Sequence, residues 1–312
     1  MAKHRKIPII VIILLIVALI IGCVGIFVAN NFEQEIKDFK AGIDYKPSES
    51  MAQIISNMDL TWRASNILRS THPALEGPQD FVDHCVDEDY PMITNACHSF
   101  EDNRIYVYDV DSELFPGFKE SNLAHELLHA IYYRLSDSEK AEINAELDSF
   151  YQSHQDQLSA YIDGYTGEQY YNELHSYISQ HVHYDDLSES LQKYYARYFK
   201  NPSKIAEFYD RYEDIWNAKQ KQLDDSFAKI EEEHDRVSAW QEDYEKRVEI
   251  YLASPNRTPQ LDAAFEVEQE ELSAAIHQFN EHNHAHNALR EEIFAYFNKI
   301  DARKALEAEN AD

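Results

Sequence analysis

Ser121-Asn-Leu-Ala-His125-Glu126-Leu-Leu-His129-Ala130 is the most informative segment of the chain. Two histidines four residues apart share one face of a helix, so both can reach a single cation. Glu126 lies on the neighbouring part of the turn, where it can hold a water that the cation polarises, and it is the predicted general base. The intervening leucines can pack inward. The segment therefore predicts a metal site on an amphipathic helix, with His125 and His129 as neutral nitrogen ligands.

A catalytic metal also needs a third protein ligand and an open position for water. The segment Asn172-Glu173-Leu-His175-Ser176, on a helix predicted over residues 167–183, offers Glu173. Here the sequence resembles the gluzincin group of zinc metallopeptidases, in which a Glu from a later helix completes the HExxH pair, often within Asn-Glu-x-x-Ser-Asp. The segment matches the Asn, Glu and Ser of that pattern, and Tyr177 stands at its Asp position. Because that Asp orients a zinc histidine, either another carboxylate takes its role or the role is absent.

Other residues compete for the third ligand position. Two acidic residues lie closer to the separation found in thermolysin-like members, and two histidines would make an all-histidine site; they are Glu146, Asp148, His154 and His175. If Glu173 is the ligand, an additional helix over residues 136–154 must be inserted, and Ser136-Asp-Ser-Glu139 is a good capping box for its start. We expect one Zn²⁺ held by His125, His129 and Glu173.

The order of motifs also resembles a group of uncharacterised, membrane-anchored bacterial proteins over about residues 51–200. The shared features are Leu60-Thr61, Cys85, Cys97, Arg104-Ile-Tyr-Val, the AHExLHA and Asn-Glu-Leu-His-Ser motifs, and Tyr194-Tyr195-x-x-Tyr198-Phe199. This resemblance implies a shared fold and metal site but no biological role.

The gluzincin resemblance implies hydrolysis of peptide bonds in a peptide or protein substrate, with zinc activating water and Glu126 taking its proton. Such sites usually add a Tyr or His that stabilises the tetrahedral oxyanion. The residues near Glu173 that could do so are Tyr170, His175, Tyr177, His181 and His183.

The amino terminus predicts the compartment. Residues 7–29 carry no charge and are long enough to cross a bilayer as a helix, with basic residues before them and acidic residues after them. We expect a single-pass signal anchor in the cell membrane, with residues 1–6 in the cytoplasm and the rest outside. The alternatives are a cleaved signal peptide and lipidation at Cys23.

Composition supports a mainly helical protein. The 312 residues include only 7 Gly and 9 Pro, which are low counts for a many-turned β architecture. The formal net charge of −29 excludes the phosphate-neutralising surface that nucleic-acid binding needs. The predicted fold class is therefore mainly α with a small β part, in which the strand-like run 104–110 could form the edge of a substrate cleft.

Two cysteines remain in the predicted exported part, Cys85 and Cys97. Two thiols in an oxidising space usually pair, so a disulfide is the first expectation and two free buried thiols are the alternative.

The last third of the chain has a different pattern. From Pro202 apolar residues recur at three- and four-residue steps amid charges, break at residues 253–259, and resume. This pattern predicts an antiparallel helical hairpin, which could bind a partner or a second copy.

The predicted organisation has five parts. They are a tail (1–6), a membrane helix (7–29), a polar stalk (30–48), an α+β zincin-like domain (49–201) and the hairpin (202–312). The alternative function is a surface scaffold in which the hairpin binds a partner and the metal site is structural or inactive.

Overall fold

The computed structural model describes residues 17, 19, 32–85 and 95–309. These residues are mainly helical with one small sheet, which confirms the prediction of a mainly α fold with a small β part. The chain divides into two compact units, residues 1–210 and 211–312. The elements of the first unit are α2 (Glu33–Gly42), α3 (Glu49–Asn57), α4 (Trp62–Ser70), β1 (Ala74–Glu76), α5 (Pro78–Cys85), β2 (Ala96–Ser99), β3 (Arg104–Tyr108), α6 (Phe118–Tyr133), α7 (Asp137–Ser153), α8 (Gln155–Ile162), α9 (Gly167–His181), the 3-10 helix η1 (Tyr184–Asp186) and α10 (Glu189–Tyr195).

The sheet has the order β1-β3-β2. β1 is parallel to β3, and β2 is antiparallel to β3 with Cys97 opposite Tyr106. The predicted strand at 104–110 is therefore present as β3, but it is the central strand and not an edge. Among the described residues β1 and β2 each pair only with β3, so both are edge strands. Strand order depends on pairing between distant segments, which the local alternation of residues does not specify.

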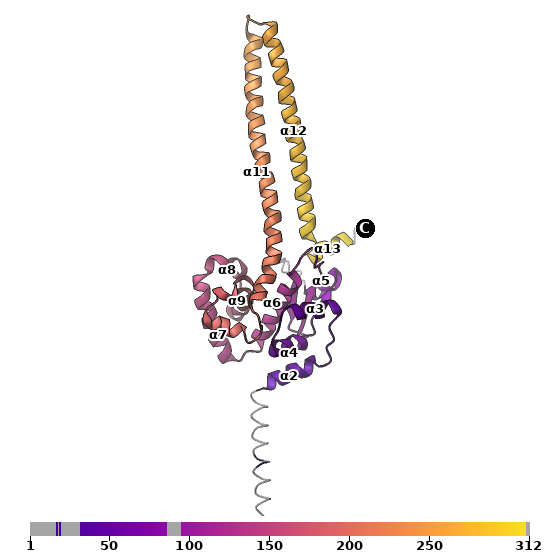
Figure 1. Ribbon diagram of the computed structural model, residues 1–312, viewed down its shortest axis with the longest axis vertical. Coiled ribbons are helices and arrows are strands. Elements are labelled where there is room, and N and C mark those ends of the chain that lie inside the picture. Colours follow the sequence, from indigo (N-terminus) through magenta and orange to yellow (C-terminus); the bar gives the residue numbers. More distant parts are fainter. Residues whose placement is uncertain (1–16, 18, 20–31, 86–94, 310–312) are drawn as a thin grey trace, which may run out of the picture. The chain divides into compact units, whose positions relative to one another are not determined.

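Helix α6 carries the histidine motif through the middle of the first unit. It contacts α9, α4 and the strands β2 and β3. Figure 1 shows α6 between the helices α7–α9 and the helices α3–α5. Most of its residues are buried, including Leu127 and Leu128, which have no exposed surface. Its N-cap, Gly117, has φ of 85°, a left-handed conformation that favours glycine. The motif is therefore held on a rigid, buried helix.

Helix α7 is the insertion that a Glu173 ligand requires. Ser136 and Glu139 form the predicted capping box at its start: the Ser136 side chain accepts from the Glu139 amide, and the Glu139 carboxylate accepts from Ser136 N–H at 2.9 Å. Ile143, Leu147 and Phe150 bury its inner face. Helix α9 follows α8 and covers α6.

The structure joins Cys85 and Cys97 in a disulfide, as the sequence predicts. The bond connects the end of α5 to β2. It therefore ties the edge strand, which lies next to α6, to a neighbouring helix.

The second unit contains the two predicted long helices. Helix α11 (Ser203–Ala253) begins in the first unit, and α12 (Pro259–Asn298) and α13 (Ala302–Glu309) follow. Thr258 caps α12 and Pro259 is its first residue, which explains why the helical pattern breaks at residues 253–259. Arg247 and Trp240 on α11 both donate to Glu268 on α12, so the two arms are antiparallel neighbours. The seam histidines make local contacts: His282 pairs with Glu233 at 2.7 Å and His286 with Ser226 at 3.1 Å.

The structure describes only part of the amino-terminal segment. Residues 7–29 lie outside the described residues apart from Val17 and Leu19, and so does Cys23. Within the described part of the chain, no helix has the length and apolar character needed to cross a bilayer. The expected stalk at residues 30–48 differs from the structure, because residues 33–42 form α2, which packs against α4. Its polar sequence hides this packing, since the buried face consists of Asp38 and Gly42.

Candidate metal centre

Helices α6 and α9 bring together the three predicted ligands. Nε2 of His125 lies 3.5 Å from Oε2 of Glu173, and Nε2 of His129 lies 3.7 Å from the same oxygen. The three side chains are largely buried, with 12%, 9% and 14% of the surface of His125, His129 and Glu173 exposed. The three side chains are therefore shielded from most of their hydration.

These separations fit a tetrahedral metal ion. With bonds of ~2.1 Å and tetrahedral angles, two ligand atoms on one zinc lie ~3.4 Å apart. The observed distances of 3.5 Å and 3.7 Å are close to that value and too long for strong direct hydrogen bonds. Two imidazoles and a carboxylate are also a ligand set that zinc uses in catalytic sites. The donor types and these two separations therefore fit zinc.

The other ring nitrogen of each histidine has a partner in the protein. Nδ1 of His125 lies 3.1 Å from Oε1 of Gln180, and Nδ1 of His129 lies 3.4 Å from Oγ of Ser176. Gln180 in turn donates to Ser121 at 2.7 Å, which fixes the orientation of its amide. Such partners set the tautomer that leaves Nε2 free for a metal. The orienting group is thus an amide from α9, not the carboxylate that the gluzincin pattern uses at the position of Tyr177.

Glu126 lies beside this group. His125, Glu126 and His129 each place one donor atom within 4.8 Å of the others. Burial raises the pKa of Glu126 to about 7, although the neighbouring His125 opposes the shift, and the backbone of His98 hydrogen-bonds to the carboxyl. His98 belongs to β2, so the edge strand holds Glu126 in place. Of the two carboxylates, Glu173 is the one with an oxygen 3.5 Å and 3.7 Å from the Nε2 atoms of the two histidines.

The electrostatics of the two histidines differ. Burial lowers the pKa of His129 to about 4, and His125 adds to the effect, so His129 is neutral at physiological pH. Burial also opposes protonation of His125, but the carboxylates of Glu173 and Glu126 outweigh it and raise the pKa of His125. A neutral imidazole is the form that binds a metal. His129 is therefore preorganised as a ligand, and a cation at the site would compete with the proton on His125.

The structure places the competing ligands in other surroundings. Asp148 accepts from the Tyr171 hydroxyl at 2.8 Å, and Glu146 lines a surface hollow beside α10. His154 stacks on Phe150, with ring centroids 3.9 Å apart. His175 is fully buried among aromatic rings, including Tyr132 and Tyr195. Glu173 is the one alternative whose carboxylate contacts the motif histidines.

Two tyrosines are close enough to the site to matter for chemistry. Tyr177 lies edge-on to His125, with ring centroids 4.8 Å apart. Tyr165 was not among the residues predicted from the sequence. Burial raises its pKa, and so do the charges of Glu173 and Glu126. The available sequence signal is the pair of glycines around it, because Gly164 and Gly167 both have positive φ, and Gly167 begins α9.

The remaining predicted oxyanion residues have other partners. Tyr170 packs on Tyr151 and Tyr171, and His183 pairs with Asp210 at 3.2 Å. His181 stacks on Tyr161, with ring centroids 3.9 Å apart. These contacts favour Tyr165 and Tyr177 over the other residues.

The chain matches no protein-family model, and no curated protein or solved structure shows significant similarity to it. The interpretation of the site therefore rests on its own geometry.

Proposed function

We propose that the protein is a zinc-dependent peptidase anchored in the cell membrane, with its catalytic unit outside. The observation that carries the proposal is the convergence of two Nε2 atoms and one carboxylate oxygen at separations of 3.5 Å and 3.7 Å, beside a second buried carboxylate. The uncharged run at residues 7–29 supports the anchor.

The edge strand β2 supports a peptide as substrate. Among the described residues β2 pairs on one side only, with β3, and it contacts α6. An extended peptide can add to such an edge through backbone hydrogen bonds. The backbone of His98 in β2 also bonds to Glu126, so a peptide along this edge lies close to the base.

Zinc at this site would polarise the scissile carbonyl and lower the pKa of water toward neutrality. Glu126 accepts the proton from the attacking water, and its raised pKa suits both taking the proton and returning it. It then donates that proton to the leaving amine. The phenol of Tyr165 or Tyr177 would donate a hydrogen bond to the oxyanion that forms when the carbonyl carbon becomes tetrahedral.

The proposal is tested by metal content and cleavage in the full chain, purified in detergent with zinc present. We expect one zinc per chain by elemental mass spectrometry, its loss in His129→Ala, and weaker binding in Glu173→Ala. His183→Ala is the matched control, because His183 pairs with Asp210 away from the ligands. Glu126→Gln should keep zinc and lose cleavage of a peptide library. No zinc in the parent chain overturns the proposal.

The scaffold function is the second candidate. The hairpin exposes large apolar side chains on both arms, including Phe227 at 51% and Phe294 at 57%. Such residues are typical of a surface that meets a partner. If Glu126→Gln leaves every phenotype unchanged and partner capture needs only residues 211–312, the scaffold function replaces the enzyme.

A further inference from the structure

Helix α2 presents an apolar stripe to solvent. Phe32, Ile36, Phe39 and Ile43 follow one another at steps of four, three and four residues, so they share one face of the helix. They are 48%, 37%, 48% and 60% exposed, although most residues of their type in the first unit are buried. A helix with a coherent apolar face that its own fold leaves uncovered is typical of an interaction surface.

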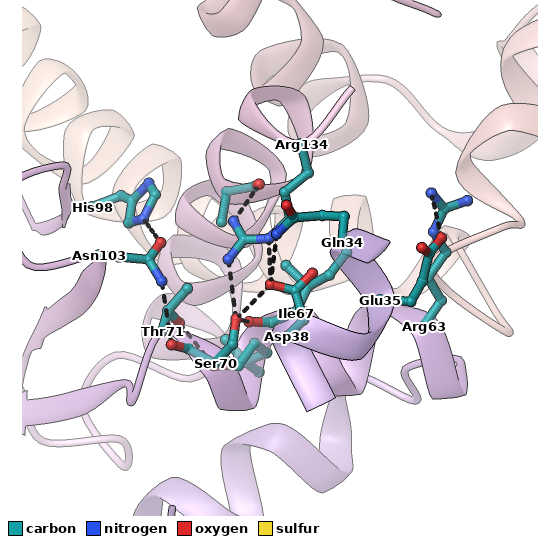
Figure 2. A network of polar contacts seen from close by, with 12 residues as sticks. Gln34, Glu35, Asp38, Arg63, Ile67, Ser70, Thr71, His98, Asn103 and Arg134 are labelled. Carbon is teal, nitrogen blue, oxygen red and sulfur yellow. Dashed lines mark hydrogen bonds and ion pairs between the residues drawn. The ribbon is translucent and has the colours of Figure 1, made fainter. Parts of the chain in front are cut away.

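A different face of α2 is fixed to the first unit. Asp38 is buried and pairs with Arg134 at 2.9 Å, and Ser70 donates to the same carboxylate oxygen at 3.2 Å. Figure 2 shows this network between α2, α4 and the residue that ends α6. At Gly42 a side chain would meet Arg69 at 2.7 Å, so α2 lies directly against α4. The stripe cannot turn inward without breaking these contacts.

Trp62, the first residue of α4, lies by another face of α2. It is 66% exposed and lines a hollow with Glu33 and Lys37, and no residue of the stripe lines that hollow. Arg63, the next residue, pairs with Glu35 at 3.4 Å and so keeps the start of α4 beside the start of α2.

The position of the stripe in the chain identifies its occupant. The uncharged run of residues 7–29 ends three residues before Phe32, so an anchored chain keeps α2 at the bilayer surface. Lys40 borders the stripe, where its charged end can reach the headgroups. A bilayer is also the apolar phase that is always within reach of this segment. These observations favour lipid over a soluble protein partner.

We propose that Phe32, Ile36, Phe39 and Ile43 form a lipid-contact surface that lies in the bilayer interface beside the anchor. Interfacial helices bury such a face at the boundary between headgroups and acyl chains. Because Arg134 ends α6 and pairs with Asp38 of α2, this contact also fixes the direction of the motif helix relative to the membrane. The proposal needs the anchor but does not need zinc or cleavage.

The test is site-directed spin labelling of the full chain in phosphatidylcholine vesicles, with Cys23→Ser and the disulfide intact. Labels at Phe39→Cys and Ile43→Cys are compared with matched labels at Lys37→Cys and Ala41→Cys, which are exposed positions on other faces of the same helix. All four positions are on the surface, so the labels should not disturb folding.

The experiment measures how accessible each spin label is to two reagents. Oxygen concentrates in lipid, whereas a nickel chelate stays in water. We expect the oxygen-to-nickel ratio at Phe39 and Ile43 to exceed that at Lys37 and Ala41 several-fold. Equal ratios at all four positions, or a chain that stays outside the vesicles, overturn the proposal. Low access to both reagents at Phe39 and Ile43 also overturns it and assigns the stripe to a second copy of the chain. None of these readouts depends on metal or activity.

Discussion

The side-chain oxygen of Gln180 lies 3.1 Å from Nδ1 of His125. Gln180 Nε2 donates to Ser121 Oγ, so its Oε1 is the atom that faces the histidine, and Nδ1–H of His125 donates to it. This bond directs Nε2 of His125 toward Glu173. A neutral amide thus orients the first ligand of the proposed metal site, a role that carboxylates often fill.

Gln180→Ala should weaken zinc binding by roughly 10- to 100-fold, because the ring of His125 loses the partner that sets its tautomer and direction. Competition with a fluorescent chelator measures the change in affinity. Gln157→Ala is the control, since Gln157 donates to the backbone carbonyl of His181 and touches no ligand. Equal affinities in the parent and Gln180→Ala would show that Gln180 does not support the site.

Tyr165→Phe should lower kcat by roughly 100-fold while zinc content stays the same, because it removes one hydrogen-bond donor to the oxyanion. The variant keeps the ring and loses only the hydroxyl, so packing is preserved. Steady-state cleavage of a peptide found in the library measures kcat and KM separately. Tyr177→Phe is compared in the same assay, and a loss confined to Tyr177→Phe would assign the role to that residue.

Much of the candidate site could be predicted from the sequence because its signals are local. The spacing of His125 and His129 specifies one helical face, and Ser136 with Glu139 specifies the start of α7. Glu173 could not be chosen from local signals alone, because the choice among several acidic residues depends on how α7 and α8 place α9 against α6. Motif resemblance favoured Glu173 among residues that periodicity alone treats as equivalent, and its carboxylate lies beside both motif histidines.

Other features depend on contacts between distant residues. Asp38 and Arg134 are 96 positions apart, and their pairing makes α2 part of the first unit although its sequence is that of a polar stalk. The identity of the edge strand is also non-local, because β2 and β1 both flank β3. Gln180 belongs to no motif, and only the packing of α9 on α6 brings it to His125.

Gly117→Ala should destabilise the first unit by at least about 2 kcal/mol. Its φ of 85° is unfavourable for any residue with a Cβ, and that Cβ would lie 2.3 Å from the carbonyl oxygen of Phe208. Urea unfolding followed by near-ultraviolet circular dichroism measures the loss. Gly77→Ala is the matched control, because nothing lies within 4 Å of a Cβ there, and it should change stability by no more than about 1 kcal/mol. Equal effects of the two substitutions would contradict the strain at Gly117.

His181 predicts how stability depends on pH. Its ring stacks on Tyr161, packs edge-on against Tyr209 and lies near Tyr177. Burial among these rings lowers the pKa of His181 to about 3, and the charge of His125 contributes in the same direction. In the unfolded chain the pKa of a histidine is about 6.5. Between these two values the unfolded state binds one more proton than the folded state, so stability falls as pH decreases from about 6.5 toward 3.

His181→Phe removes this proton and keeps a ring in the aromatic stack. Relative to the parent chain, the variant should gain roughly 2 kcal/mol of unfolding free energy between pH 7 and pH 5, because the parent alone loses the contribution of a neutral His181. Urea unfolding of both chains at several pH values measures the difference. The difference isolates His181, since every other titrating group is common to both chains. Parallel curves for the two chains across this range would show that His181 is not held neutral by its burial.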